Sequence, residues 1–252
     1  MRFARFAIGS TIGYGIVTDD GIRAMTTTPF LPWQETDEVF DPVDVRLLAP
    51  VLPSKVVAVG LNYADHAAER NKPLPSEPLL FLKPSTSVIG HRETILLPPQ
   101  SERVDHEAEL AVVIGRAARD LDPDEAGEAI LGYTCANDVT ARDLQDRDVQ
   151  FTRAKGFDTF CPLGPHIVTD VDPSSLEISC LVNGAVRQSS NTKELIFPPA
   201  VLVSYVSSVM TLLPGDVILT GTPAGIGPLG DGDTVTVEVS GVGALENRVA
   251  SR

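Results

Sequence analysis

The chain has 252 residues, of which 43% are hydrophobic, and 34 acidic against 20 basic residues give a formal net charge of −14. A chain of this length can bury a large core without disulfide bonds or a structural metal. The acidic excess argues against a nucleic-acid-binding surface and against binding to anionic membranes, because both need a basic footprint.

The N-terminal segment "MRFARFAIGSTIGYG" lacks the uninterrupted apolar core and the cleavage pattern of a secretory signal. No stretch approaches the ~20 apolar residues that a membrane-spanning helix needs. The cysteines, Cys135, Cys161 and Cys180, are widely spaced and form no CxxC pair, which indicates buried thiols in a reducing compartment. We therefore expect a soluble, cytoplasmic protein.

The first 50 residues predict a small β-rich unit. The segments "FARFAIG" and "GYGIVTDDGI" are strand-like, and Asp20-Gly21 is a hairpin signal. Several prolines follow, and they indicate a domain boundary near Pro50–Pro53. We expect a small N-terminal domain over residues 1–52 and a larger domain over residues 53–252.

The larger domain begins with a segment whose residues favour a β-strand. The segment "KVVAVG" predicts a buried strand, and "YADHAAERN" predicts a short helix that opens near Asp65. The segment "VDHEAELAVVIG", residues 104–115, turns wholly apolar and predicts another buried strand. A short helix and a strand are expected in "DPDEAGEAILGYTCAND". The segment "VTARDLQDRD" predicts a helix with a capping box formed by Thr140 and Asp143.

The last third of the chain has strand character. Asn183-Gly184 lies between two strand-like runs and is a strong type I′ hairpin signal. Further on, Val235, Val237 and Val239 alternate with polar residues, as in a half-buried antiparallel strand. We expect a mostly β domain of the α+β class, with a few short helices around a closed or sandwiched sheet.

The start of the segment 104–115 is unusual because four of five positions are ionisable: Asp105, His106, Glu107 and Glu109. Residues two apart in a strand share a face, so Glu107 and Glu109 are expected side by side. Two like charges in a poorly solvated place repel, and a hard divalent cation such as Mg²⁺ between them removes that repulsion. The alternative is a strand that begins at the surface, with both glutamates in solvent.

Two further motifs carry chemistry. Asp138 ends an apolar segment before a helix; as a third carboxylate it suits Mg²⁺ or Mn²⁺ better than zinc, and the alternative is a helix cap. His66 and Glu69 stand three apart on a helix, where the glutamate can fix the imidazole tautomer and raise the basicity of the other nitrogen, as in a general base. The alternative is a solvated helix face.

Lys155 precedes an apolar loop and Lys83 precedes a proline. Either can neutralise a substrate carboxylate, and the alternative for each is a surface role. The glycine-rich segment "GTPAGIGPLG", residues 221–230, lacks the ending of a P-loop and the spacing of a dinucleotide-binding motif. Its backbone N–H groups can cradle a carboxylate, although the segment also fits a simple turn.

Seven segments, taken together and in order, resemble the fumarylacetoacetate hydrolase family: "VVAVGLNYADHAAE", "FLKPSTSVIG", "DHEAELAVVIG", "GYTCANDVTARDLQ", "KGFDTFCPLGP", "VNGAVRQSSNT" and "LLPGDVILTGTPAGIGP". They span roughly residues 55–250, and so many matches in order are highly specific. The first 50 residues resemble the short, variable N-terminal piece of the smaller, homodimeric bacterial and mitochondrial members.

The resemblance implies a mixed β-sandwich roll, a homodimer, and a Mg²⁺ or Mn²⁺ ion held by Glu107, Glu109 and Asp138. His66 and Glu69 match the short lid helix and water-activating pair of the family, and Lys155 matches a lysine close to the bound substrate. The substrate-binding residues implied by the resemblance are Arg142, Gln145 and Thr222.

Family members hydrolyse acylpyruvates or fumarylpyruvate, decarboxylate oxaloacetate, isomerise hydroxymuconate-like dienes or dehydrate sugar acids. We expect cleavage of a C–C bond in a β-dicarbonyl 2-oxo acid through a metal-stabilised enolate, by hydrolysis of an acylpyruvate or fumarylpyruvate or by decarboxylation of oxaloacetate. The alternative enzyme is a 2-hydroxyhepta-2,4-diene-1,7-dioate isomerase or decarboxylase of aromatic-acid catabolism. A non-enzymatic carboxylate-binding module would need the loss of His66, Glu69 or a metal ligand.

The lid is expected over residues 62–78, where a short polar helix is followed by three prolines. Such a segment buries little apolar surface, so it is expected to be loose without ligand and to order over a bound substrate. Specificity is expected from residues after Asn62 and near Phe157 and Asn191.

Overall fold

The computed structural model describes all residues 1–252 and consists mostly of β-strands in three sheets, with a few short helices. The twelve strands of the large sheet are β1 (Arg2–Ile8), β2 (Thr11–Thr18), β3 (Gly21–Met25), β4 (Glu35–Phe40), β5 (Arg46–Leu47), β6 (Val56–Gly60), β7 (Leu79–Lys83), β8 (Val88–Ile89), β11 (Ala108–Ile114), β12 (Ile130–Asn137), β14 (Cys161–Val168) and β17 (Val217–Leu219). The predicted α+β class with a mixed β-roll is confirmed.

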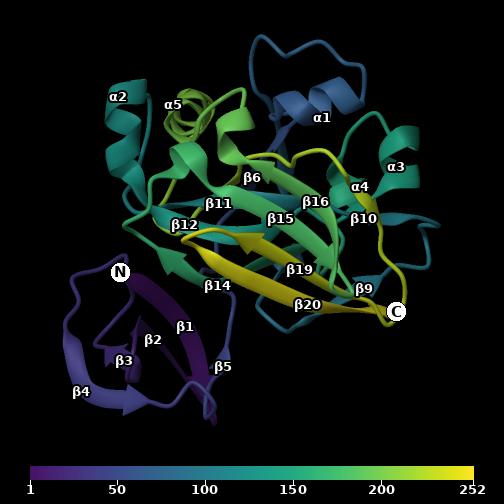
Figure 1. Cartoon of the computed structure of the whole chain (residues 1–252). Coiled ribbons are helices and arrows are strands. Elements are labelled where there is room, and N and C mark those ends of the chain that lie inside the picture. The colour runs from purple at the N-terminus through teal and green to yellow at the C-terminus, as the bar shows by residue number, and fades with distance from the viewer.

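Two smaller sheets complete the β structure. The three-stranded sheet contains β10 (Val104–His106), β13 (Thr140–Ala141) and β18 (Gly227–Pro228). The five-stranded sheet contains β9 (Thr94–Leu97), β15 (Glu177–Val182), β16 (Ala185–Asn191), β19 (Thr234–Val239) and β20 (Gly243–Ser251). The five-stranded sheet packs across the large one, with β11 and β12 between the helices and β19 and β20 (Figure 1).

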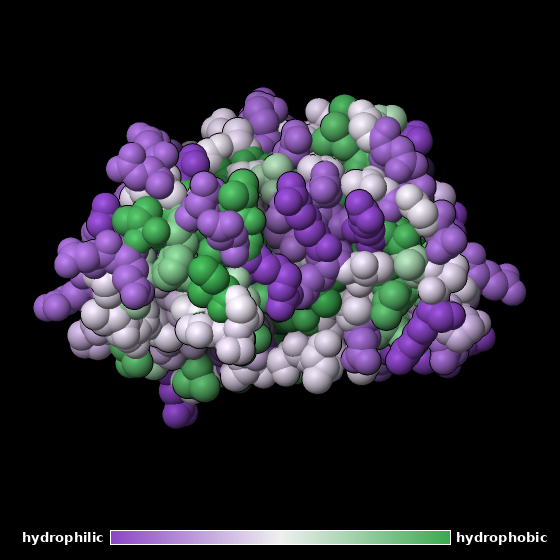
Figure 2. Space-filling view, turned by 90° about the horizontal axis from the view of Figure 1, so that it is seen from below, coloured by the Kyte–Doolittle hydropathy of each residue, from purple (hydrophilic) through white to green (hydrophobic).

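The N-terminal strands β1 to β4 form successive hairpins and lie at one corner of the molecule, drawn in purple in Figure 1. They continue the large sheet, because Arg2 and Phe3 of β1 pair with Val168 and Ile167 of β14. Seen from below, hydrophobic side chains occur in small groups among hydrophilic ones (Figure 2), consistent with the acidic composition. The division at residue 52 stays a prediction.

Strand β11 explains why its sequence is a continuous apolar run. All seven of its residues are buried. Alternate side chains enter different cores: Leu110, Val112 and Ile114 join the core beneath the five-stranded sheet. Ala111 and Val113 join the core that also contains residues of the N-terminal strands. A strand covered on both faces loses the polar alternation of a half-exposed one.

The turn chemistry of the five-stranded sheet agrees with the prediction. Asn183 and Gly184 connect β15 to β16 with φ of 53° and 78°, the left-handed pair that a type I′ turn requires. Val235, Val237 and Val239 of β19 are buried, as their alternation indicated.

The five α-helices are α1 (Ala64–Glu69), α2 (Pro123–Ala126), α3 (Arg142–Arg147), α4 (Thr152–Lys155) and α5 (Pro199–Val209). Helices α2 and α5 pack together at one end, and α1, α3 and α4 gather at the other end (Figure 1). The expectation of strands throughout the last third is wrong at α5. The capping box is also wrong, because Thr140 Oγ1 donates to the carbonyl of Asp138 and α3 begins without a side-chain cap. No helix is both long and apolar enough to cross a membrane.

Candidate active site

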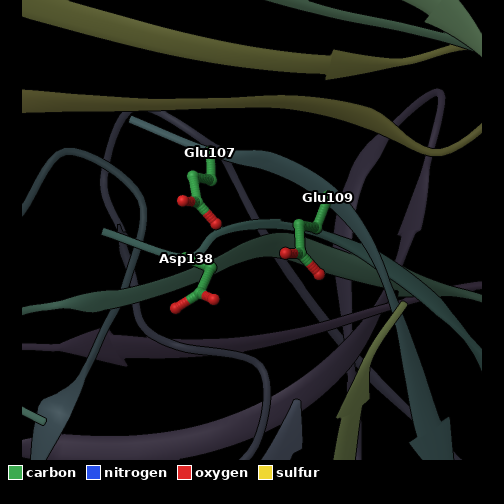
Figure 3. Close-up of side chains that lie close together, drawn as sticks. All are labelled: Glu107, Glu109 and Asp138. Atoms are coloured by element: carbon green, nitrogen blue, oxygen red, sulfur yellow. The ribbon is translucent and has the colours of Figure 1, made fainter. Parts of the chain in front are cut away.

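Three carboxylates from two adjacent strands meet in the interior. Pairing of β11 with β12 sets Ala108 opposite Asn137, so the residues flanking this pair are brought together. The ligand oxygens of Glu107, Glu109 and Asp138 lie within 4.8 Å of one another. Figure 3 shows the three side chains pointing into a common space. Their exposed fractions are 6%, 1% and 1%. The alternatives of solvent-exposed glutamates and of a helix cap at Asp138 are therefore wrong.

The local backbone differs from the expected single strand. Glu107 falls between β10 and β11, at the point where the chain passes from the three-stranded sheet to the large one. The break is held by the last residue of β12 and the residue after it. Asn137 Oδ1 accepts from the N–H of Glu107 at 3.0 Å, and the carbonyl of Glu107 accepts from the N–H of Asp138 at 2.9 Å. Glu107 and Glu109 nevertheless face the same space (Figure 3).

Two buried lysines surround the carboxylates. Lys155 of α4 donates to Glu107 Oε2 at 3.0 Å, to Asp138 Oδ2 at 2.5 Å and to Thr140 Oγ1 at 2.8 Å. Lys83 of β7 donates to Asp138 Oδ1 and to the carbonyl of Val139. Of these two buried lysines, Lys155 lines the cavity described below and Lys83 does not. Lys83 lies behind Asp138, so its predicted contact with substrate and its predicted surface role are both wrong.

Glu107 and Glu109 differ in how strongly their surroundings favour the ionised form. Burial disfavours the charge of Glu107, but the cations of Lys155 and Arg142 outweigh burial and lower its pKa to about 2. Burial, followed by the negative charges of Asp138 and Glu107, raises the pKa of Glu109 well above its usual value. A divalent cation would relieve that repulsion, and buried carboxylate oxygens form the donor set that Mg²⁺ or Mn²⁺ prefers. The residues therefore fit such an ion.

A second network fixes Arg142. Its guanidinium donates to Glu107 Oε1, to Gln145 Oε1 and, at 2.9 Å, to Asp105 Oδ2. Asp105 is fully buried and also accepts from Arg103 at 2.8 Å. The buried carboxylate of Asp105 thus orients Arg142, a role for which the sequence offered no signal beyond the ionisable cluster.

A cavity of about 340 Å³ opens above the carboxylates. The predicted residues that line it, besides the carboxylates, are His66, Arg142, Gln145, Lys155 and Thr222. Phe81 and Phe151 supply apolar walls. Phe157 and Asn191, expected near the substrate, do not line it: Phe157 packs on Phe160, and Asn191 donates to Glu177 and caps a 3₁₀ turn.

Helix α1 covers the cavity and presents the predicted pair. The Nδ1 of His66 lies 3.0 Å from Glu69 Oε2, and the His66 side chain is only 11% exposed. The solvated-face alternative is therefore wrong for His66. With Nδ1–H donating to Glu69, the lone pair of Nε2 remains available. Asp65 accepts from Ser190 of β16 at 2.5 Å, which attaches α1 to the five-stranded sheet.

The glycine-rich segment joins the site through Gly221 and Thr222. The N–H of Gly221 donates to Glu109 Oε2 at 2.6 Å, and a side chain at Gly221 would lie 2.8 Å from Asn62 Cβ. Thr222 is bonded to Gln188, which sequence reasoning did not single out. The sequence offers only a weak indication that Gln188 has a role. It is a buried glutamine in β16 between two exposed residues, Arg187 and Ser189.

The chain is similar to several known proteins along its whole length. Residues 55–250 match the sequence family described as fumarylacetoacetate (FAA) hydrolase, C-terminal, and residues 1–50 match the family described as Rv2993c-like, N-terminal. The crystal structure of 5-carboxymethyl-2-hydroxymuconate delta-isomerase from Mycobacterium smegmatis is 50% identical, with a TM-score of 0.94 over 100% of both chains. Oxaloacetate tautomerase FAHD2B, mitochondrial, from Homo sapiens is 46% identical over 88% of this chain and 72% of its own. Maleylpyruvate hydrolase from Sphingobium sp. SYK-6, solved with manganese(II) and pyruvate, is 29% identical, with a TM-score of 0.82 over 100% of this chain and 99% of its own.

Proposed function

The chain belongs to the fumarylacetoacetate hydrolase family, and from that membership we propose that it is a divalent-metal-dependent enzyme acting on a small 2-oxo acid. One observation carries the proposal: three clustered, buried carboxylates face a cavity that also contains Lys155 and His66. Mg²⁺ or Mn²⁺ would be held by Glu107, Glu109 and Asp138.

The charges of the site suit a developing enolate. When bound, the cation would supply positive charge that stabilises negative charge on the 2-oxo oxygen of the substrate. Lys155 lines the cavity and adds a second positive charge beside the carboxylates. Thr222 and Arg142 line the cavity and would donate hydrogen bonds to a substrate carboxylate.

His66 supplies the proton chemistry. Its Nε2 takes a proton from C3 of the 2-oxo acid, the C–H electron pair forms the C2–C3 double bond and the carbonyl π pair moves onto the 2-oxo oxygen. Glu69 stabilises the resulting imidazolium. Delivery of the proton from the imidazolium to the 2-oxo oxygen gives the enol, and the reverse sequence gives ketonisation. Delivery of the proton to a distal carbon of a conjugated chain gives isomerisation. Among the relatives described above, the more similar ones are named as a delta-isomerase and a tautomerase, which supports this reaction.

The second candidate is the C–C cleavage expected from the sequence. The same imidazole can activate water to attack a distal ketone, and a carboxylate at that position would leave as carbon dioxide without water. The likeness to a maleylpyruvate hydrolase supports this reading. Both candidates use the same cation site and the same His66–Glu69 pair.

The cavity favours a substrate with two carboxylates. Arg70 and Lys72 line it, and neither pairs with an acidic side chain. The lining contains four basic and four acidic side chains, so a bound divalent cation leaves an excess of two positive charges. A dianionic 2-oxo acid matches that excess, with its second carboxylate near Arg70 and Lys72.

The test is a substrate panel with Mg²⁺: enol-oxaloacetate, followed by ultraviolet absorbance, then fumarylpyruvate, acetylpyruvate and 2-hydroxyhepta-2,4-diene-1,7-dioate. We expect rapid ketonisation or isomerisation of the diacids and weak activity on acetylpyruvate. Cleavage of fumarylpyruvate at a higher kcat/KM than any proton transfer would favour the hydrolase instead. Absence of activity on all four would overturn the proposal.

We also propose a homodimer. Strand β7 is an edge of the large sheet, and its Leu79 and Leu82 are 56% and 48% exposed, which leaves an apolar edge to be covered. Light scattering should give twice the chain mass of 26.9 kDa. A mass of one chain at dilute concentration would contradict this. A cytoplasmic location stays a prediction.

A further inference from the structure

We propose that Gln188 is a positioning residue that fixes the hydroxyl of Thr222 as a hydrogen-bond donor to the substrate carboxylate. The inference rests on the proposed function, because it concerns how the cavity recognises a 2-oxo acid. Gln188 does not line the cavity and touches none of the three clustered carboxylates. It would therefore act only through its neighbours.

The side-chain amide of Gln188 is 1% exposed and fully hydrogen-bonded. Its Oε1 accepts from the N–H of Ala108 and from His106 Nδ1, both at 2.9 Å. Its Nε2 donates to Thr222 Oγ1 at 2.8 Å and to the carbonyl of Pro223 at 2.9 Å. The amide thus connects the two residues that flank Glu107 to the loop that carries Thr222.

Two of these partners fix the orientation of the amide. The backbone N–H of Ala108 can only donate, so the atom facing it must be the oxygen. The carbonyl of Pro223 can only accept, so the atom facing it must be the nitrogen. A flipped amide would lose both bonds in a buried place, which is costly.

The fixed amide determines the role of Thr222. Because Gln188 donates to Thr222 Oγ1, that oxygen uses a lone pair and keeps its own hydrogen. No group of the chain accepts that hydrogen, and Thr222 lines the cavity. The hydroxyl is therefore held ready to donate to an anionic oxygen. The same logic makes Nδ1 of His106 a donor.

Substitution by glutamate would reverse this polarity. A carboxylate at position 188 accepts from Thr222, so the threonine hydrogen would turn away from the cavity. The shape of the side chain would hardly change. Gln188→Glu therefore tests the direction of the hydrogen bond to Thr222 at nearly constant shape, and it also loses the bond to the carbonyl of Pro223. Gln188→Met loses both bonds and is the reference for that second loss.

The experiment is calorimetric titration of the Mg²⁺-loaded protein with pyruvate. We expect Gln188→Met, Gln188→Glu and Thr222→Val each to raise the Kd about tenfold or more, the loss typical of a hydrogen bond to a charged group. The double variant Gln188→Met with Thr222→Val should bind no more weakly than Thr222→Val alone, because Gln188 acts through Thr222. Mn²⁺ affinity, measured by electron paramagnetic resonance, should change much less than pyruvate affinity.

Asn247→Leu is the matched control. Asn247 is equally buried and bridges the carbonyls of Gly90 and Glu93, away from the cavity. It should lower Tm and leave pyruvate affinity unchanged. Additive losses in the double variant, or a loss of Mn²⁺ affinity as large as that of pyruvate, would overturn the inference. If the loaded wild-type protein fails to bind pyruvate, the proposed function itself fails; wild-type binding with unchanged Gln188 variants overturns only the inference.

Discussion

The backbone N–H of Gly225 donates a hydrogen bond to Glu69 Oε1 at 3.1 Å, while Glu69 Oε2 contacts His66. One carboxylate thereby joins α1 to the glycine-rich segment and holds the imidazole. Gly225 has a φ of 93°, and a Cβ there would lie 2.4 Å from the carbonyl of Arg187. The position therefore requires glycine.

Gly225→Ala should displace the loop and break the contact with Glu69. We expect a loss of stability of about 1–3 kcal/mol, the cost of a strained backbone, together with a lower kcat. Gly127→Ala is the control, since a Cβ there meets nothing within 4 Å and φ is −58°. Thermal unfolding and steady-state kinetics of both variants check the prediction. Equal behaviour of the two would mean that the loop tolerates the side chain.

The carboxylates should differ in what they do for the metal-free protein. Glu109→Gln keeps neutral a side chain whose charge is disfavoured by burial and by the carboxylates of Asp138 and Glu107, so the Tm in EDTA should stay the same or rise while Mn²⁺ affinity falls. Asp138→Asn leaves Lys83 and Lys155 without a carboxylate that both contact. It should therefore cost about 3–5 kcal/mol, as breaking a buried ion pair does. Differential scanning fluorimetry and Mn²⁺ titration separate the two effects. A lower Tm in EDTA for Glu109→Gln would contradict the repulsion.

His66→Ala and Glu69→Gln should separate the reactions. Loss of a general base slows tautomerisation or hydrolysis by about 10²–10⁴-fold. Decarboxylation of oxaloacetate needs neither a base at C3 nor an attacking water, so it should suffer much less. Kinetics of both variants on enol-oxaloacetate, an acylpyruvate and keto-oxaloacetate decide this. Equal losses on all three would mean that the pair serves lid closure, and the proton-transfer role would be dropped.

Arg70→Gln and Lys72→Gln should discriminate between substrates by charge. Each should raise KM for a dicarboxylate by about tenfold, as expected for the loss of a charge-assisted bond, and leave KM for acetylpyruvate unchanged. Arg119→Gln removes an equal charge that does not line the cavity, and it serves as the control. A uniform change for both substrate classes would place the second carboxylate elsewhere.

Local sequence patterns predicted strands and turns correctly where a single physical rule determines the structure of a segment. The apolar run of β11, the Asn183-Gly184 turn and the alternation of β19 all follow from periodicity and turn chemistry. Helix α5 did not, because its valines favour strands and only packing of its apolar face on the core makes it helical.

Strand periodicity also predicted part of the candidate site. The spacing of Glu107 and Glu109 placed two carboxylates on one face, but only the pairing of β11 with β12 brings Asp138 to them. No local pattern distinguishes Lys155 in the cavity from Lys83 behind Asp138, and only the family resemblance singled out Lys155. Long-range orientation, which no local pattern records, decides such roles. The metal, catalytic and substrate assignments remain predictions.

The position of Glu107 between two sheets has a consequence for local unfolding. A cation shared by Glu107, Glu109 and Asp138 would cross-link the three-stranded sheet to the large one. The three-stranded sheet is made of strands of two or three residues, whereas β11 is buried on both faces. Removal of the cation should therefore speed amide hydrogen exchange first in β10, β13 and β18, while β11 stays protected. Resistance to proteases at the glycine-rich segment would then follow the supply of metal in the cell.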